Sequence, residues 1–257
     1  MTEANDPAHS DPDPAVLVEF VGIPGAGKST LASELARLLR ADSVPIRTPI
    51  SEVNAIDSRP LRILRKSAEI GRYTLRHPYG TIGWLRTVRR LSDGSIHDVA
   101  KVGFNWLFVA GCLTQRRSDR GVTIADQGLL QAYWSTILGS STPSVDDVHS
   151  IIETAFPDVP LLVVLVEVDT TVARQRLAAR SDNPSRVSVN IGGTSRPEHN
   201  YSVEDAQIAY DHVKKSLIAI ETASENSSVI RCVNDEPSDV ERNVEAIRAE
   251  LSERFSG

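Results

Sequence analysis

The chain has 257 residues, 40% of them hydrophobic, and a formal net charge of −6. This length and apolar content suit a single α/β domain with a substantial core. The net negative charge argues against general nucleic-acid binding, so we expect no nucleic-acid partner. The two cysteines, Cys112 and Cys232, lie far apart, which excludes a disulfide framework and fits a cytoplasmic protein. The apolar runs are too short to span a bilayer.

Residues 1–14 are polar, acidic and proline-containing, and we expect a disordered tail that is not a secretory signal. Downstream, short apolar runs alternate with helical periodicity, which predicts an α/β domain over 15–257 with helices on both faces of a parallel sheet. A helical insert, 48–118, separates the second and third expected strands. The expected strands are 15–21, 43–47, 121–126, 161–168 and 228–233, and the expected helices are 28–40, 170–180, 203–223 and 238–254.

The first expected strand runs into Gly-Ile-Pro-Gly-Ala-Gly-Lys-Ser at 22–29. This segment fits G-x-x-x-x-G-K-[ST], the P-loop or Walker A pattern, in its required place between a strand and a helix. Glycines let backbone N–H groups turn toward a phosphate, and the helix N-terminus adds positive partial charge. Lys28 would reach the β- and γ-phosphates, and the Ser29 hydroxyl would bind Mg²⁺. The predicted nucleotide contacts are Gly22, Pro24, Gly25, Ala26, Gly27, Lys28, Ser29 and Thr30.

A second candidate site follows the third expected strand, where Asp126 stands at the carboxyl end of an apolar run. Ligands of parallel α/β sheets bind outside these strand ends. A carboxylate there would hold Mg²⁺ through its water shell or take a proton from an acceptor hydroxyl. The alternative is a structural aspartate that caps a turn with Gly128.

A third candidate site lies on the helix expected at 170–180. Arg176 and Arg180 are four residues apart and share one helix face, and Arg186 follows them. Arginines that lead into a closing loop would neutralise the charge on a transferring phosphoryl group. The segment 181–202 contains Gly and Pro residues and is long enough to act as a lid. The alternative is a solvated basic helix face.

In this order, the motifs resemble the P-loop nucleoside and nucleotide kinases, most closely thymidylate kinase, over about 15–49, 120–136 and 161–254. The resemblance implies a three-layer P-loop NTPase fold with five parallel strands in the order 2-3-1-4-5, and ATP and Mg²⁺ as cofactors. It implies contacts to the adenine nucleotide from Arg176, Asn234, Glu236 and Pro237, and to the acceptor from Arg47 and Gln127.

Two positions depart from the thymidylate kinase pattern. Thr48 stands where that family has Glu, and Gln127 where it has Arg. The insert also shows no nucleobase-recognition motif. The resemblance therefore supports the ATP half of the site and leaves the acceptor open.

The insert is strongly basic between Arg59 and Leu91. Nine basic residues stand there against one acidic residue, Glu69, which gives a net charge of +8. Such a segment suggests an anionic ligand. It would cover an anionic acceptor with residues such as Arg62, or make peripheral contact with an anionic membrane, or pair with acidic helices of the same fold.

These features predict a kinase that moves the γ-phosphoryl group of ATP to a small-molecule acceptor, which the basic insert suggests is anionic. The alternative is a nucleotide-binding regulatory P-loop ATPase without such an acceptor. A GTPase switch is disfavoured because the chain has no Asn-Lys-x-Asp motif. The sequence leaves the oligomeric state open, with a homodimer as one option.

Overall fold

The computed structural model describes residues 15–91, 96–114, 121–138, 145–155, 159–179, 201–221 and 226–255. Its centre is a five-stranded sheet in the order β2-β3-β1-β4-β5, in which all neighbouring strands run parallel. This topology confirms the predicted fold class. The strands are β1 (Val16–Val21), β2 (Ile46–Arg47), β3 (Val122–Ala125), β4 (Leu161–Glu167) and β5 (Ser227–Val233).

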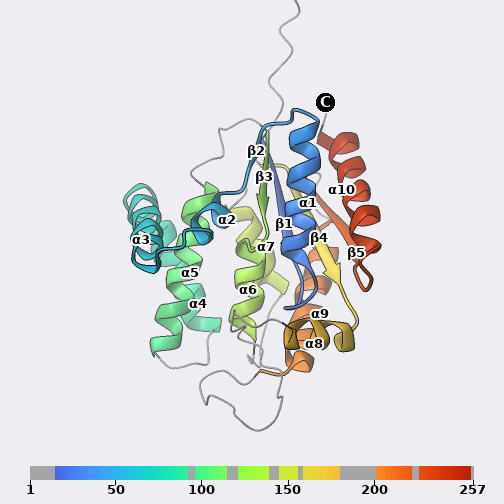
Figure 1. Cartoon of the computed structure of the whole chain (residues 1–257). Coiled ribbons are helices and arrows are strands. Elements are labelled where there is room, and N and C mark those ends of the chain that lie inside the picture. Colours follow the sequence, from blue (N-terminus) through green and yellow to red (C-terminus); the bar gives the residue numbers. More distant parts are fainter. Residues whose placement is uncertain are drawn as a thin grey trace, which may run out of the picture.

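Helices cover both faces of the sheet, which explains why its central strands are nearly continuous apolar runs. Every residue of β1 is buried, and so is every residue of β4 except the last. On one face, α1 (Lys28–Ala41) packs beside α10 (Asp239–Phe255) (Figure 1). The other face carries α6 (Leu129–Ile137), α7 (Val145–Ala155) and α9 (Val203–Glu221), and α8 (Thr170–Ala178) follows the end of β4.

Two helices of this face, α6 and α7, are not among the helices expected from the sequence. In α6 every residue except Ser135 is buried, so its sequence lacks the alternation of apolar and polar faces that marks a surface helix. Because α6 is buried on all sides, its sequence carries no helical periodicity of apolar residues.

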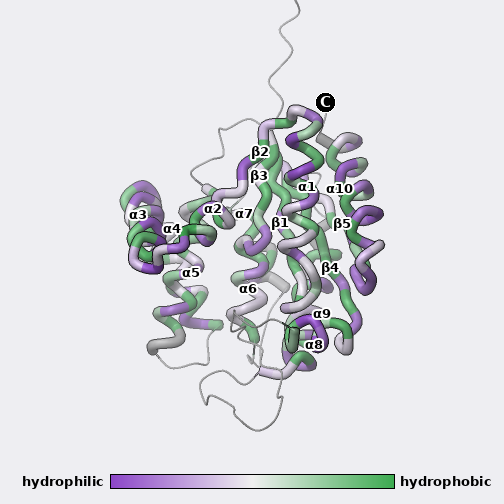
Figure 2. Tube along the Cα trace, in the orientation of Figure 1, coloured by the Kyte–Doolittle hydropathy of each residue, from purple (hydrophilic) through white to green (hydrophobic). Residues whose placement is uncertain are grey.

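The described part of the insert 48–118 is largely helical. It contains α2 (Pro49–Asn54), α3 (Arg59–Arg76), α4 (Pro78–Leu91) and α5 (Ile96–Thr114). Both α3 and α4 pack on α5, which in turn contacts α6. Trp106 and Phe108 of α5 are buried, so the insert shares the core of the sheet domain. Figure 2 shows hydrophobic and hydrophilic positions mixed along α3, in contrast to the mainly hydrophobic central strands. Among the described helices, none has the length and apolar character needed to cross a membrane.

Candidate active site

The P-loop connects β1 to α1 and adopts a conformation that requires glycine. Gly25 and Gly27 have φ angles of 89° and 90°, the left-handed region that other residues rarely enter. The neighbours also leave no room for a side chain. A Cβ atom on Gly25 would lie 2.7 Å from the carbonyl oxygen of Ala173, and one on Gly27 would overlap the amide of Asn234. These two glycines therefore fix the path of the loop against α8 and the end of β5.

Helix α1 begins at Lys28 without a side-chain cap. The positive end of the helix dipole lies at this end of α1 and favours an anion there. The Lys28 ammonium donates to the carbonyl oxygens of Gly22, at 2.7 Å, and Ile23, at 3.0 Å. These contacts hold the positive charge within the loop, where the sequence predicts the phosphates to bind.

Asp126 lies directly beside the P-loop. Its Oδ2 accepts from the Ser29 hydroxyl at 3.0 Å, and its Oδ1 accepts from the Ser51 hydroxyl at 2.9 Å. The structure therefore brings together the two residues that the sequence assigns to Mg²⁺. A hydroxyl and a carboxylate oxygen are hard ligands of the kind that Mg²⁺ uses, together with water and substrate phosphates. The described residues contain no cluster of three or more His, Cys, Asp or Glu side chains suited to a metal, and a Mg²⁺ site of this kind needs none.

Ser51 was not anticipated as a site residue. It lies in the first turn of α2, four residues after β2 ends at Arg47. Because β2 and β3 are adjacent and parallel, the segments that follow them meet at the same edge of the sheet. The adjacency of β2 and β3 could have indicated Ser51, because α2 follows β2 and Asp126 follows β3.

Arg176 and Asn234 join the P-loop to the segment after β5. Arg176 donates to the carbonyl oxygens of Asn234 at 2.8 Å, of Asp235 at 2.9 Å and of Gly25 at 3.4 Å. The Asn234 amide donates to the carbonyl oxygen of Ala26 at 2.7 Å and is buried. Two of the four residues that the resemblance assigns to the adenine nucleotide, Arg176 and Asn234, thus lie against the loop. In this arrangement the Arg176 guanidinium binds backbone carbonyls.

Glu236 and Pro237 belong to the exposed turn between β5 and α10. The backbone N–H groups of Asp235 and Glu236 donate to the Asp239 carboxylate at 3.0 and 2.9 Å. These hydrogen bonds hold the pKa of Asp239 below its usual range, with the Glu236 contact as the largest cause. The turn is therefore fixed at the start of α10, close to the P-loop contacts of Asn234.

A buried carboxyl group supports the P-loop through the first residues of α6. Glu19 of β1 is fully buried, and its Oε1 accepts from the backbone N–H groups of Leu130 at 2.6 Å and Gln131 at 3.0 Å. Gln131 then accepts from the Gly22 N–H at 3.1 Å. Burial raises the pKa of Glu19 to about 8, against the lowering effect of these backbone hydrogen bonds. The start of α6 is thereby tied to both β1 and the P-loop.

The three predicted acceptor contacts lie toward the β2 side of the site. Arg47 ends β2, opposite Thr123 of β3, and Gln127 is exposed directly after Asp126. Arg62, on α3, donates to the carbonyl oxygens of Asn54 and Ile56 at 3.3 and 3.5 Å. Arg62 thus fastens the connection between α2 and α3, and acceptor binding by these three residues stays a prediction.

Part of the predicted site falls outside the described residues. Arg180 and Arg186 lie there, as does the expected lid 181–202 apart from its last two residues. Their proposed contact with the phosphates stays a prediction.

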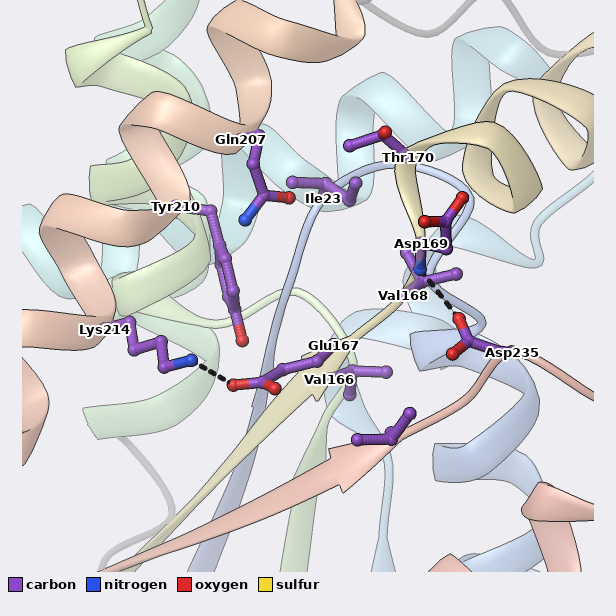
Figure 3. A pocket seen from close by; sticks show the side chains of 11 residues that line it. Ile23, Val166, Glu167, Val168, Asp169, Thr170, Gln207, Tyr210, Lys214 and Asp235 are labelled. Atoms are coloured by element: carbon purple, nitrogen blue, oxygen red, sulfur yellow. Dashed lines mark hydrogen bonds and ion pairs between the residues drawn. The ribbon is translucent and has the colours of Figure 1, made fainter.

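A polar pocket of about 380 Å³ adjoins the P-loop on the side of α9 (Figure 3). Ile23 of the loop borders it, together with Glu167 at the end of β4 and Lys214 and Tyr210 of α9. Lys214 pairs with Glu167. Burial, followed by the charge of Glu167, raises the pKa of Tyr210. The crevice at the carboxyl ends of the strands therefore extends past the loop toward α9.

A family model described as an AAA domain matches residues 17–192. The chain belongs to this family. The match includes β1 from Leu17 onward, the P-loop, Asp126 and Arg176, so the predicted membership of a P-loop nucleotide kinase family is confirmed. The finer likeness to thymidylate kinase is not specifically supported.

Solved structures of a deoxyadenosine kinase from M. mycoides are similar to this chain. One, with the products dCMP and dCDP bound, is 13% identical, covers 93% of this chain and 99% of its own, and has a TM-score of 0.47. Another, with dATP bound, is 15% identical over 92% of this chain and 100% of its own, with a TM-score of 0.47. This degree of similarity identifies no substrate. A search of curated proteins found no match.

Proposed function

We propose that this protein is a cytoplasmic, ATP-dependent kinase that transfers the γ-phosphoryl group to an anionic small molecule. The observation that carries the proposal is the 3.0 Å contact between Ser29 and Asp126, directly beside Lys28 of the P-loop. The phosphate-binding loop, the Lys28 ammonium and two oxygen-bearing side chains suited to Mg²⁺ thus lie together at one edge of the sheet. Phosphoryl transfer depends on these parts, since its catalysis is mainly positioning and charge stabilisation.

Each residue has a defined task in this proposal. The loop N–H groups and the start of α1 bind the β- and γ-phosphates, and Lys28 neutralises charge on the γ-phosphoryl group. An oxygen of the acceptor attacks the γ-phosphorus in line, the bond to the bridging oxygen breaks, and ADP leaves. Asp126 would hold Mg²⁺ through its water shell or take the proton of the acceptor hydroxyl. Mg²⁺, when bound, supplies further neutralisation of the phosphate oxygens.

The charge around the insert supports an anionic acceptor, such as a nucleotide or another phosphorylated metabolite. We place it near the ends of β2 and β3, in reach of Arg47 and Gln127, with Arg62 behind them. If this is right, the acceptor KM should rise with added KCl more than the KM for ATP–Mg, because salt screens exposed charges beyond about 8 Å.

Closure of the loop 181–202 would bring Arg180 and Arg186 onto the phosphates. Limited proteolysis tests this step directly. Cleavage within 181–202 should slow when a bisubstrate analogue is bound. Equal cleavage with and without the analogue would argue against closure.

The decisive experiment is an acceptor screen that measures ADP release. It should include nucleosides, nucleoside monophosphates, sugars, sugar phosphates and lipid-linked phosphates. Lys28→Ala is the matched control, and its turnover should fall by about 100-fold or more because the site loses an electrostatic contact to the transition state. Unchanged ADP formation in this variant would remove the P-loop from the mechanism. ADP release that no acceptor stimulates would favour the regulatory ATPase instead.

A further inference from the structure

Helix α3 turns an apolar stripe toward solvent. Leu61, Leu64 and Leu75 are 53%, 65% and 85% exposed, and with Ala68 they recur at spacings of three, four and seven residues, which places them on one face of the helix. The opposite face is the one that packs, because Glu69 and Tyr73 of α3 are buried. Single exposed apolar residues are ordinary, whereas an apolar stripe facing away from the core needs an explanation.

Helix α4 also exposes apolar side chains. Tyr79 is 88% exposed and Ile82 is 47% exposed, while Trp84 and Val88 of the same helix are buried. We call Leu61, Leu64, Leu75, Tyr79 and Ile82 the outer apolar residues of the insert. Figure 1 shows α3 at the edge of the molecule far from α10, so the insert forms the side of the molecule opposite α10.

Basic residues are frequent in the same two helices, and no acidic side chain within 59–91 is exposed. The single acidic residue of this segment, Glu69, is buried and paired with Arg65 at 3.1 Å and Arg72 at 3.3 Å. Further arginines of α3 and α4 are exposed, namely Arg59, Arg76, Arg86 and Arg89. With a net charge of +8 in a chain of net charge −6, this side of the molecule fits an anionic partner.

We propose that α3 and α4 dock the protein on an anionic membrane surface. A helix face that carries apolar side chains among arginines is typical of segments that bind the surface of an anionic bilayer. The apolar side chains enter the boundary of the acyl chains, and the arginines bind the phosphate headgroups. A second copy fits less well, because a two-fold interface would place the same basic surfaces against each other. A nucleic-acid duplex would meet the arginines with its phosphates and leave the leucines without an apolar partner.

Docking on this side leaves the P-loop free. The P-loop and Asp126 lie at the carboxyl ends of β1 and β3, whereas α3 packs on α5 at the far side of the insert. The site and the docking side are connected through α2, where Ser51 contacts Asp126 and Arg62 of α3 binds the carbonyl oxygens of Asn54 and Ile56. A kinase held in this way would act close to the membrane with its nucleotide site open to solution.

Flotation of the full chain with vesicles tests the proposal without reference to its activity. We expect recovery with vesicles that contain phosphatidylglycerol and little recovery with pure phosphatidylcholine vesicles, and we expect added KCl to reduce the bound fraction. Leu64→Glu combined with Leu75→Glu should weaken binding by about tenfold or more, since both changes put charge on the apolar stripe. The matched control is Ile208→Glu, at an apolar position of α9 that is 60% exposed and lies outside the insert.

The leucine variant should keep the circular dichroism spectrum and the nucleotide affinity of the unaltered chain, because neither leucine is buried. Three results would overturn the proposal: equal recovery with neutral and anionic vesicles, no recovery with either, or recovery that the leucine substitutions leave unchanged. A dimer in light scattering that these substitutions abolish, without vesicle binding, would assign the face to a second copy. Stronger binding to duplex DNA than to vesicles at the same salt would assign it to nucleic acid. None of these outcomes depends on the proposed kinase activity.

Discussion

Replacing Glu19 with Gln should remove a pH dependence of stability that this one buried carboxyl creates. The carboxyl lies on β1, fully buried, with its Oε1 on two backbone N–H groups of α6 and its Oε2 without a partner among the described residues. Glutamine has the same shape and keeps an oxygen for the two N–H groups. Its NH₂ group takes the place of the hydroxyl that a protonated Glu19 would carry.

The size of this change in the free energy of unfolding follows from the raised pKa of Glu19. The folded protein holds the Glu19 proton up to about pH 8, whereas the carboxyl in the unfolded chain loses it near 4.5. Folding therefore binds a proton between these values. The stabilisation is complete below about pH 4.5 and is lost as the pH rises through the folded pKa. At about 1.4 kcal/mol for each pH unit, the unaltered chain should lose about 3 kcal/mol from this group between about pH 5.5 and pH 8.

Urea unfolding followed by tryptophan fluorescence measures this loss. The free energy of unfolding of Glu19→Gln, relative to the unaltered chain, should rise by about 3 kcal/mol between about pH 5.5 and pH 8. Glu253→Gln, at an exposed position near the end of α10, is the control and should follow the unaltered chain at both pH values. Parallel stability curves for Glu19→Gln and the unaltered chain would refute the reasoning.

Three further substitutions test the contacts around the P-loop. Gly128→Ala would drive a Cβ atom into the Glu19 carboxyl, so its free energy of urea unfolding should fall by about 1–3 kcal/mol, and unaltered stability would show that the contact gives way easily. Gly27→Ala combines a φ of 90° with overlap onto Asn234, so fluorescent nucleotide titration should show at least about tenfold weaker binding; equal affinity would mean that the loop relaxes without cost. Asp126→Asn should retain ATP binding while steady-state ADP release falls by about 100-fold or more, and near-normal kcat at saturating Mg²⁺ would make Asp126 a turn residue only.

The sequence predicted the sheet and its ligand edge because the relevant signals are local. Strands β1 and β4 are apolar runs since both of their faces are covered. The P-loop is a short motif with fixed spacing, so Lys28 and Ser29 could be placed without a structure. Asp126 could be placed because it directly follows an expected strand, and the carboxyl ends of parallel strands share one edge.

The supporting contacts could not be predicted, because they join residues far apart in the chain. Glu19 and Gln131 are 112 positions apart, and neither belongs to a motif that would announce their hydrogen bond. In the sequence alone, a charged residue in the middle of β1 does not match its apolar neighbours. The Glu19 carboxyl is explained by the N–H groups at the start of α6 that it binds. The sequence did not predict α6, because that helix is buried on all sides.

The separate contacts to the P-loop have one consequence in common. Gln131 binds the N–H of Gly22, Asn234 binds the carbonyl of Ala26, and Arg176 reaches the carbonyl of Gly25. Each contact comes from a different element, so the loop is held by the body of the domain as well as by its own glycines. A loop ordered before the nucleotide arrives loses little conformational entropy on binding, and more of the binding free energy is then retained as affinity. The glycines allow the shape of the phosphate site, and residues distant in sequence keep it in that shape.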